Sequence, residues 1–589
     1  MRTVKGPPEA ADQHLGWLTA AGALAAAGLV RAARGYRPFP SIDDFAYVPM
    51  ALAKLDPHLF SRDTLLRETP LHVPLLPSLL AVLEATTGLA PGFWLITIVL
   101  SLLTALAMYR WMRALGVAGA LLPMALIVVC AGRVQGLGRA EFDGIFGDAF
   151  HFQWAALCAL LWAYDGVLRA RWVRALALLV LSVALHPAVG AHGVVAMTCG
   201  VAFARASRTR GCSWLIPITV AACALPAASS ALFMRGGGTE SITEFSEAAQ
   251  AFLFRLPHEY EIDRWKLMLV LLLVAAGISG AARLAGRTVA MPIAAMLGLL
   301  VGHLLLLTAA CVLYEARSMQ HWSAWTTLPF QLSLSRTSSI SMALAAVLGA
   351  TAIEAGFLGA HPRRARGFGG LASGTVLAAA VVCLAAVQVK WSWPVGLSCG
   401  VAAVSAVAIR ERVGYRALGV AWVGLLIGGL VLFAGSGPLA ARVGSDQEQL
   451  LRWARSKTPV DGLFIIPPGF QEFRIHAVRS VYVDFKTVTP ADTQLLRLWR
   501  RRLEQVAAPD ALAREARGWP GIAEWDRTYA GRNTPVRIES LLRETGADYF
   551  VWDRQGLLVP PFVHRERLPN PSLAIAFENA RYTVYRLVR

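Results

Sequence analysis

Two adjacent acids, Asp43 and Asp44, follow the first apolar run of the chain, Leu15–Val30. A carboxylate at a membrane surface can act as general base toward an acceptor hydroxyl. It can also hold a divalent cation such as Mg²⁺ or Mn²⁺ against a phosphate leaving group. A solvated loop acid or a helix N-cap is the alternative that needs no chemistry. Because adjacent side chains point in different directions, we expect one acid to face a site and the other to orient it.

A second group of polar residues lies between the third and fourth apolar runs. It contains Glu141, Asp143 and Asp148, and His151 follows Asp148 by one helical turn, on the same helix face. A charge at mid-bilayer costs at least about 2.5–3.5 kcal/mol, and the cost falls toward the interface. These residues therefore either line a polar site at the membrane boundary or form a solvated loop with a helix cap.

Later connections carry arginine and histidine side chains that can bind an anion. Arginine suits phosphate because its guanidinium group is always charged and donates in a fork. We predict substrate-binding roles for Glu141, Asp143, Asp148, His186, Arg255, His258, Arg317 and Arg336. The alternative is an ordinary surface position for each arginine and a structural role for each histidine.

The elements that must position these residues are membrane helices. Of the 589 residues, 56% are apolar and only 16% are charged, which is typical of a polytopic membrane protein. The net charge is +18, but most arginines form short clusters between apolar runs, so we expect no nucleic-acid partner. The eight cysteines lie in or beside apolar runs, so neither a disulfide framework nor a cysteine metal site is indicated.

About thirteen apolar runs approach or exceed the length that crosses roughly 30 Å of hydrocarbon as a helix. They lie near residues 14–32, 91–110, 116–132, 147–168, 172–188, 190–206, 212–233, 265–282, 288–312, 337–357, 371–389, 393–409 and 417–436. Arginine clusters fall at every second connection and predict the cytoplasmic face. The connections 35–90, 133–146, 234–264 and 313–336 mix acids with arginine, some of them also carry His or Trp, and they are predicted to lie outside.

Segment 71–88 decides on which side the acid pair lies. It is apolar but short, and Pro74, Pro77 and Glu84 interrupt it, so we predict a re-entrant or interfacial helix. If the segment crosses the membrane instead, the loop with Asp43 and Asp44 becomes cytoplasmic. The basic residues within 31–37 favour that alternative.

The tail, residues 437–589, has the pattern of a small α/β domain. We predict a helix over 447–457 and strands over 462–466, 480–485, 548–552 and 581–586. The tail has no G-x-G-x-x-G, Walker or H-E-x-x-H pattern, so a nucleotide or zinc role has no support. The predicted organisation is thus a membrane domain, 1–436, followed by an extracytoplasmic domain, 437–589, in a plasma (inner) membrane protein.

With these features together, the chain resembles the GT-C superfamily of membrane glycosyltransferases. The matching features are Asp43-Asp44 after the first helix, the interfacial segment 71–88 and the extracytoplasmic tail. More narrowly, it is similar to functionally uncharacterised bacterial multi-pass proteins of this architecture. That similarity lies in Tyr47, Pro49, Asp56, Pro57, His186, Pro187, Arg255, Pro257, His258, Pro467, Pro468 and the run 483–486. Many GT-C members have Asp-x-Asp or Glu-x-Asp where this chain has adjacent acids.

The resemblance implies an inverting transferase that moves a sugar from a polyprenyl-phosphate donor to an extracytoplasmic glycan, lipid or protein. Asp43 or Asp44 would be the base or a metal ligand, and Arg255, His258, Arg317 and Arg336 would hold the lipid phosphate. The alternatives are a lipid or polysaccharide transporter or flippase, and a non-catalytic envelope assembly protein. Transporters place polar sites at mid-bilayer, often between repeated halves. Here no repeat is evident, and the polar residues collect on one predicted face.

Overall fold

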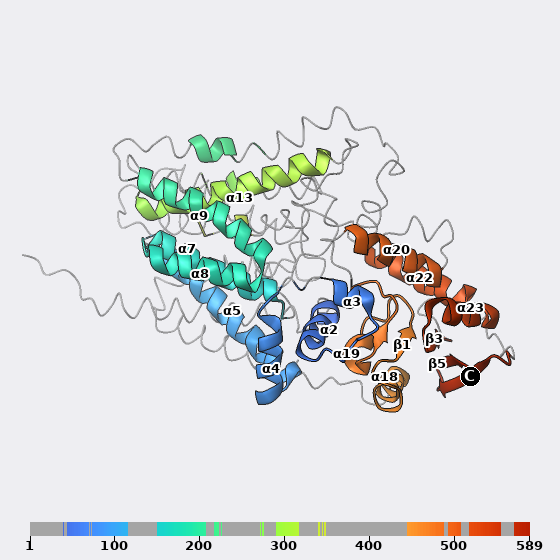
Figure 1. Cartoon of the computed structure of the whole chain (residues 1–589). Coiled ribbons are helices and arrows are strands. Elements are labelled where there is room, and N and C mark those ends of the chain that lie inside the picture. Colours follow the sequence, from blue (N-terminus) through green and yellow to red (C-terminus); the bar gives the residue numbers. More distant parts are fainter. Residues whose placement is uncertain are drawn as a thin grey trace, which may run out of the picture.

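The structure is a computed structural model with a helical bundle and a C-terminal α/β domain (Figure 1). It describes residues 39–40, 44–69, 71, 73–115, 150–207, 217–222, 225, 271, 274–275, 278, 290–316, 340–341, 344, 347–348, 445–487, 493–507, 518–554 and 570–588.

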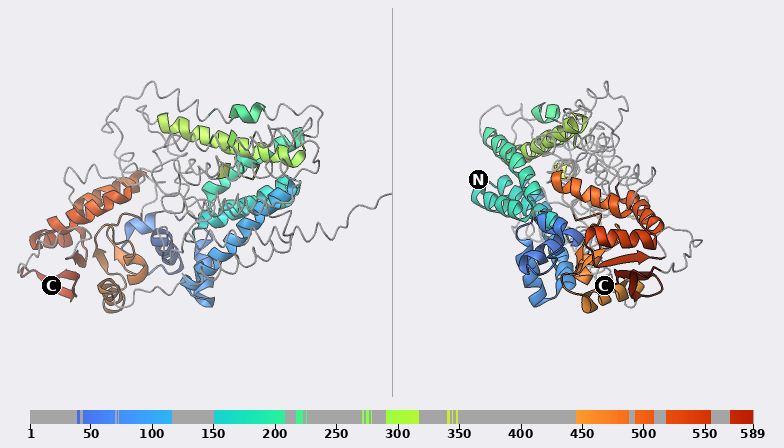
Figure 2. Two further views of the ribbon diagram at one scale, coloured as in Figure 1. Left: turned by 180° about the vertical axis from the view of Figure 1, so that it is seen from behind. Right: turned by 45° about the vertical axis from the view of Figure 1, so that its right-hand side comes forward.

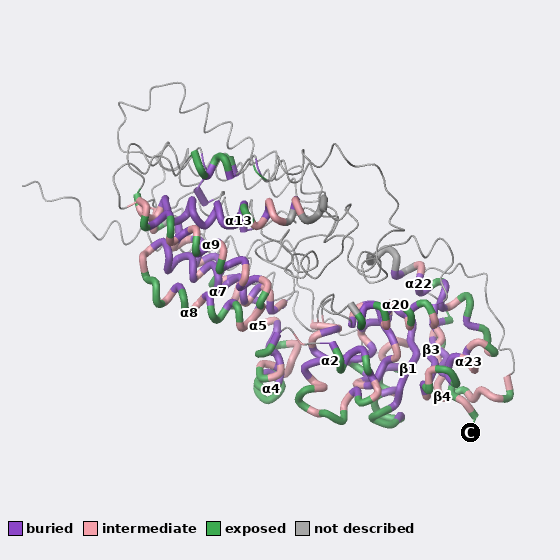
Figure 3. Tube along the Cα trace, turned by 45° about the horizontal axis from the view of Figure 1, so that its top comes forward, coloured by how far each residue is buried: buried purple, intermediate pink, exposed green. Residues whose placement is uncertain are grey.

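The described part of the bundle has five main helices. They are α5 (Leu89–Ala114), α7 (Phe152–Leu168), α8 (Trp172–Leu185), α9 (Pro187–Ala206) and α13 (Met291–Ala316). Leu89–Trp111, Pro187–Ala206 and Met291–Ala309 are long and apolar enough to cross a membrane, with mean hydropathies of 2.1, 1.5 and 2.0. On α8 the apolar side chains of Val173, Leu176 and Val180 are 60% or more exposed, as on a lipid-facing surface (Figure 3).

The prediction of a helical membrane protein with a C-terminal α/β region is therefore confirmed. The total of about thirteen spans stays a prediction. Five of the predicted spans correspond to the helices above, of which α7 and α8 have only 17 and 14 residues. The other eight lie wholly or mostly outside the described residues, as does the predicted domain boundary at 436–437.

Helices α9 and α13 pack with their backbones in contact. A Cβ atom on Gly302 would lie 2.4 Å from Ala196 Cα, and one on Gly298 would lie 2.5 Å from the Cys199 carbonyl oxygen. The two glycines are four residues apart, the spacing that lets membrane helices approach closely. Since Gly298 meets Cys199 while Gly302 meets Ala196, the two helices run antiparallel.

An ion-pair cluster joins α5, α7 and the start of α8 at one end of the bundle. The buried Asp165 carboxylate accepts from Arg110 Nε at 3.0 Å and from Arg169 Nε at 2.8 Å. Arg169 Nη2 also donates to the Arg110 carbonyl oxygen at 2.8 Å. The guanidinium groups of Arg110 and Arg174 lie over the Trp162 ring. We call this the basic end of the bundle; the opposite end holds the starts of α5, α7 and α9 and the end of α8.

The first loop forms three helices that lie between the opposite end of the bundle and the α/β domain (Figure 1). They are α2 (Asp44–Leu55), α3 (Thr64–Glu68) and α4 (Leu76–Thr86). Helix α4, within the segment 71–88, has 11 residues. At 1.5 Å per residue it is about 16 Å long, roughly half the hydrocarbon thickness, so α4 is too short to cross.

The α/β domain has five strands in the order β2-β1-β3-β5-β4. The strands are β1 (Leu463–Ile465), β2 (Ser480–Val481), β3 (Tyr549–Asp553), β4 (Leu573–Glu578) and β5 (Tyr582–Leu587). Strands β2, β1 and β3 are parallel, and β5 pairs antiparallel with both β3 and β4. Its helices are α18 (Asp446–Lys457), α19 (Phe473–Ala477), α20 (Thr493–Ala507), α22 (Gly518–Arg532) and α23 (Pro535–Thr545).

Helices cover both faces of this sheet (Figure 2). On one face, Ile465 and Phe550 pack against Trp499, Trp525 and Leu541 of α20, α22 and α23. On the other face, neighbouring strand residues pack against α18 and α19, in a core that contains Leu450, Phe464, Phe473 and Val551. Side chains that alternate between faces thus build two cores, which gives a three-layer α/β/α arrangement.

The predicted helix and four predicted strands of the tail correspond to α18, β1, β2, β3 and β5. Strand β2 ends at Val481, earlier than predicted, and Asp484 beyond it takes part in a polar network described below. Strand β4 was not predicted. It lies at the edge of the sheet and is only partly buried, and Ala574 and Ala576 weaken the β-branched or aromatic pattern of a strand.

The surroundings of two helix glycines, Gly302 in α13 and Gly531 in α22, predict different effects on stability for their substitution by alanine. Gly302→Ala inserts a methyl group into the Ala196 backbone and should lower stability by about 1–3 kcal/mol. Gly531→Ala, in α22, meets no atom within 4 Å and should be neutral or slightly stabilising, because alanine favours helix. Thermal unfolding of the detergent-solubilised protein measures both. Equal melting temperatures for the two variants would contradict the close α9–α13 packing.

Candidate functional site

Two of the residues predicted from the sequence to act in a site are described by the structure, Asp44 and His186. Asp43, Glu141, Asp143, Asp148, Arg255, His258, Arg317 and Arg336 lie outside the described residues. Within the described residues, no group of three or more His, Cys, Asp or Glu side chains is placed to hold a metal ion. The roles of all ten residues stay predictions.

Asp44 is the first residue of α2. An acid in the first turn interacts favourably with the positive end of the helix dipole. Helix α2 then continues as an apolar segment whose Ala46, Val48 and Ala51 are buried. The acid thus lies at the start of a helix that packing holds in place.

His186 separates α8 from α9. Pro187 disfavours the helical conformation at the residue before it and suits the first position of a new helix. His186 is accordingly extended, and its Nδ1 accepts from the Val189 backbone N–H at 3.5 Å. This N-cap geometry is a structural role for His186, and it leaves the predicted binding role open.

One apolar cluster brings the neighbourhoods of Asp44 and His186 together. Phe45 and Tyr47 of α2, Phe150 and Phe152 at the start of α7, and Leu185 at the end of α8 all belong to it. Ring pairs lead through this cluster from Phe39 to Phe93 at 4.9 Å and on to Phe150 at 5.0 Å. The start of α2, the start of α7 with His151 and the α8–α9 junction therefore meet at the end of the bundle opposite Asp165.

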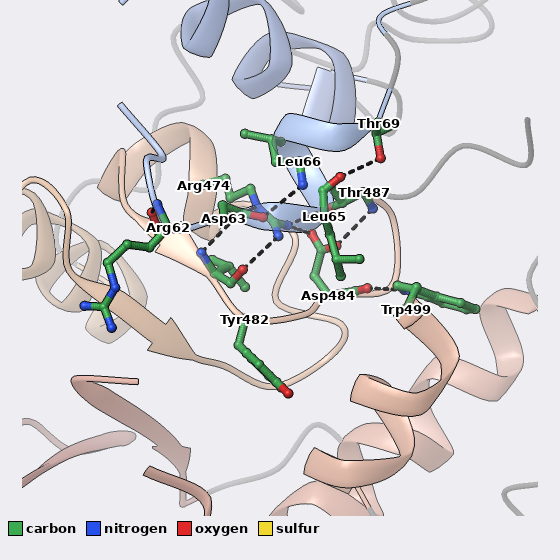
Figure 4. A network of polar contacts seen from close by, with 12 residues as sticks. Arg62, Asp63, Leu65, Leu66, Thr69, Arg474, Tyr482, Asp484, Thr487 and Trp499 are labelled. Carbon is green, nitrogen blue, oxygen red and sulfur yellow. Dashed lines mark hydrogen bonds and ion pairs between the residues drawn. The ribbon is translucent and has the colours of Figure 1, made fainter. Parts of the chain in front are cut away.

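The strongest polar contact of the first loop is made with the α/β domain (Figure 4). Arg474 of α19 donates from Nε to Asp63 Oδ2 at 2.7 Å and also pairs with Asp484 and Thr487. Asp63 Oδ2 also accepts from the Val481 backbone N–H at 3.0 Å, and Asp63 Oδ1 caps α3 through Leu66 N–H at 3.0 Å. Arg474 and Asp63 are 0% exposed. Burial opposes the guanidinium charge, but Asp484 and Asp63 outweigh it and raise the pKa of Arg474.

Further contacts extend this docking along Arg62–Leu66. The Leu65 side chain is buried in the α/β core with Trp499 and Leu496. Arg62 pairs with Asp548 at 2.5 Å, and Arg502 Nη2 donates to Thr64 Oγ1 at 2.7 Å. In the other direction, Ile475 of α19 joins the apolar cluster around α2. The first loop and the α/β domain thus share cores as well as ion pairs.

Membrane topology follows from this docking. A buried ion pair cannot form across a bilayer, so the first loop and the α/β domain lie on the same side. The chain between residues 69 and 445 must therefore cross the membrane an even number of times. The sequence predicts twelve spans between residues 91 and 436. A crossing by segment 71–88 would make thirteen, so the docking and the shortness of α4 both favour the interfacial alternative.

A second polar cluster lies where β1 and β3 end. Asp526 of α22 accepts from the Gly469 backbone N–H at 2.8 Å, and Arg581 binds the Asp553 carboxylate through Nε and Nη2. A Cβ atom on Gly469 would lie 2.3 Å from Asp526 Oδ2, so glycine permits this approach. Burial, aided by the Asp553 charge and opposed by the Gly469 N–H and Arg581, raises the pKa of Asp526 to about 7.

Comparison with known proteins assigns no family to the whole chain. Residues 445–506, from α18 through most of α20, match a domain of unknown function (DUF6798). No curated protein matches the chain. Among solved structures it is similar to the oligosaccharyltransferase AglB of the archaeon Archaeoglobus fulgidus, in complex with an inhibitory peptide and a dolichol-phosphate. The identity is 13% over 90% of this chain and 69% of that one, with a TM-score of 0.30. This likeness is too weak to assign a fold or a function.

The docking predicts that two distant positions react alike with a membrane-impermeant maleimide. Lys54→Cys at the end of α2 and Lys457→Cys at the end of α18 replace exposed residues. In intact cells or sealed vesicles of one orientation, both should be labelled or both protected, with the parent chain as the control for its own cysteines. Labelling of one position alone would show that the two segments lie on opposite sides.

The buried Asp526 carboxyl predicts a stability that depends on pH. Its folded pKa of about 7 exceeds its ordinary value of 3.8, so the folded state binds more protons between these values. Stability should therefore fall by up to about 1.4 kcal/mol per unit as the pH rises toward 7, and this contribution should level off above 7. Asp526→Asn should remove this slope in thermal unfolding of the full chain. The exposed control Asp461→Asn should keep it, and an unchanged slope in Asp526→Asn would contradict the assignment.

Proposed function

We propose that this protein is a membrane glycosyltransferase that moves a sugar from a polyprenyl-phosphate donor to an extracytoplasmic acceptor. The sequence resemblance to GT-C transferases supports this proposal. The observation that carries it is the meeting of the start of α2, bearing Asp44, with the start of α7 and the end of α8, which His186 follows. They meet at the end opposite the Arg110–Asp165–Arg169 cluster. The positive-inside rule assigns the basic end to the cytoplasm, so the acid pair would face outward.

In this proposal Asp43 or Asp44 takes the proton of the acceptor hydroxyl as that oxygen attacks the anomeric carbon of the sugar. The bond from that carbon to the phosphate oxygen breaks in the same step, and polyprenyl phosphate leaves with the electron pair, which inverts the configuration. Glu141, Asp143, Asp148 and His186 would bind hydroxyl groups of donor or acceptor. Arg255, His258, Arg317 and Arg336 would stabilise the phosphate charge as it develops, an interaction stronger in the transition state than in the ground state.

The acid pair also suits a divalent cation. Carboxylate oxygens are the donors that Mg²⁺ and Mn²⁺ prefer, and Mg²⁺ is commonly held by one or two carboxylates together with substrate phosphate and water. A bound cation would neutralise charge on the leaving phosphate. Asp44 at the start of α2 fits this donor set. The acid that does not hold the cation would remain the base.

One observation favours the alternative of a lipid transporter or flippase. The Tyr164 hydroxyl and His303 Nε2 are hydrogen-bonded at 2.7 Å between α7 and α13, and both side chains are buried in the bundle. Polar groups within a bundle are costly and often mark a transport path. The same contact also has a structural explanation, because it pairs the Tyr164 hydroxyl with His303 Nε2 and joins two helices. The glycosyltransferase proposal accounts for more of the polar residues.

Replacing both acids tests the proposal. Asp43→Asn/Asp44→Asn should lower transfer at least about 10²-fold, because general-base catalysis contributes about 10²–10⁴-fold. The matched control is Glu68→Gln/Glu84→Gln, which removes two exposed acids from the same loop. Proteoliposomes receive a panel of polyprenyl-phosphate-linked radiolabelled hexoses and pentoses, with envelope extract as acceptor. Release of polyprenyl phosphate and label in the acceptor are measured.

The controls separate the proposal from its alternatives. Membrane abundance of the double Asn variant should equal that of the parent, so that a loss reports chemistry. Transfer retained by this variant would contradict the role of the acid pair. Movement of the labelled donor across the bilayer without cleavage of its sugar would favour the flippase.

A further inference from the structure

We infer that Arg474 is a positioning residue, through which the α/β domain holds the acid-bearing first loop against the end of the bundle. Arg474 pairs with Asp63 of the loop and with Asp484 of the domain, and all three side chains are at most 1% exposed. The inference rests on the proposed function, because it takes the Asp43–Asp44 segment as the part of the loop whose position matters. The docking itself is independent of that function.

Two adjacent residues of α19 connect the domain to the loop. Arg474 binds Asp63, which caps α3, while Ile475 packs in the apolar cluster with Val48 and Ala51 of α2. Helix α19 therefore contacts both helices that flank the turn of the loop. A displacement of α19 would move the start of α2 with it.

The turn between α2 and α3 links the position of Asp63 to that of the start of α2. Phe60 has a left-handed backbone (φ 54°) and is fully buried against Ala46 and Met50 of α2 and Leu66 of α3, with Val478 of the domain beside them. A large side chain in this conformation persists where the surrounding structure fixes it. The segment from Asp63 back to Ala46 is thus one packed unit, and Asp44 lies two residues before it.

Arg474 is the residue whose removal should weaken the docking most, because it is the cation between two buried carboxylates. One guanidinium faces two buried carboxylates, and its fork fixes both the distance and the angle of each pair. Removing Arg474 leaves two buried carboxylates facing each other without the cation that pairs them, which strongly disfavours the docked state. The partly exposed pair Arg62–Asp548 and the exposed contact Arg502–Thr64 contribute much less.

Loss of the docking between the first loop and the α/β domain matters for chemistry, because transfer depends on the position of the base. A displacement of about 1 Å at a reacting group costs on the order of 10²-fold in rate. An undocked loop would keep both acids but place them incorrectly. Arg474 would then act on the reaction without touching the substrate.

Chemical cross-linking tests the docking without reference to activity. Thr64→Cys/Arg502→Cys places two thiols at an exposed contact of the loop and the domain. In the full-length protein, a short bismaleimide should cross-link them in high yield. Adding Arg474→Met should lower the initial cross-linking rate at least about fivefold, because the buried carboxylates lose their cation. Arg474→Lys should fall between the two, since it keeps the charge without the fork.

Two variants keep the test independent of misfolding. Asp63→Asn alters the loop side only and leaves the Arg474–Asp484 pair within the domain, so it should slow cross-linking while hydrogen exchange of 535–553 stays unchanged. The matched controls are Arg452→Met and Asp56→Asn, which change an exposed ion pair of α18 and a partly exposed acid of the loop. Both controls should cross-link at the parent rate.

Transfer activity then separates positioning from a general structural role. Arg474→Met should lower transfer, and prolonged cross-linking that traps the loop should restore much of it. Unchanged cross-linking in both Arg474→Met and Asp63→Asn would overturn the inference. Slowed cross-linking with unchanged transfer would also overturn it, while leaving the proposed function to stand. Only retained transfer in the Asp43→Asn/Asp44→Asn variant would contradict the proposed function.

Discussion

The buried guanidinium of Arg474 is the constraint on which the arrangement of the chain depends. Arg474 lies 411 positions after its partner Asp63, and the helices of the bundle lie between the two residues in the sequence. A buried charge is tolerated only when it is paired and hydrogen-bonded. The first loop and the α/β domain must therefore stay docked for Arg474 and Asp63 to remain buried. This docking sets the parity of the membrane crossings and puts the acid-bearing loop in the same aqueous compartment as the α/β domain. One electrostatic contact therefore limits the membrane topology of the chain between residues 63 and 474.

The two halves of the molecule achieve stability by different physical means. In the bundle, Gly298 and Gly302 let the α9 and α13 backbones touch, because lipid offers no hydrophobic gain to helices that pack together. In the α/β domain, burial of large side chains such as Trp499, Trp525 and Tyr529 supplies the driving force. The cluster of Phe39, Phe93 and Phe150 lies where these regimes meet.

Local pattern was enough to predict most of the elements. Apolar length predicts α5, α9 and α13, and the β-rich runs 462–466 and 548–552 predict β1 and β3. Strand β4 escaped prediction because an edge strand that is half buried does not need a strong apolar pattern. The docking escaped it for another reason. Asp63 has the local features of a helix N-cap, and Arg474 is one basic residue among many, so neither residue shows its partner.

In the candidate site too, the individual residues could be recognised from the local sequence, whereas their proximity in the fold could not. The acid pair was recognisable because two carboxylates beside an apolar run are unusual. Asp44 begins α2, which is the position that the helix-start alternative describes, and the role of the pair in a site stays a prediction. His186 was recognisable as a helix end, and the structure shows it as the N-cap of α9 through Val189 N–H, while its binding role stays a prediction. What brings their neighbourhoods together is the cluster of Phe45, Phe150 and Leu185. No spacing rule predicts that cluster, because its members come from three separate segments.

The position of the acid pair has a consequence for how such a site could be kept rigid. Helices in lipid can tilt and slide at modest cost, whereas a buried ion network in a water-facing core has discrete, well-defined geometry. The start of α2 contacts both: its apolar face lies on the bundle end, and α19 fixes it from the domain side. The loop is therefore held by the α/β domain on one side and by the end of the bundle on the other.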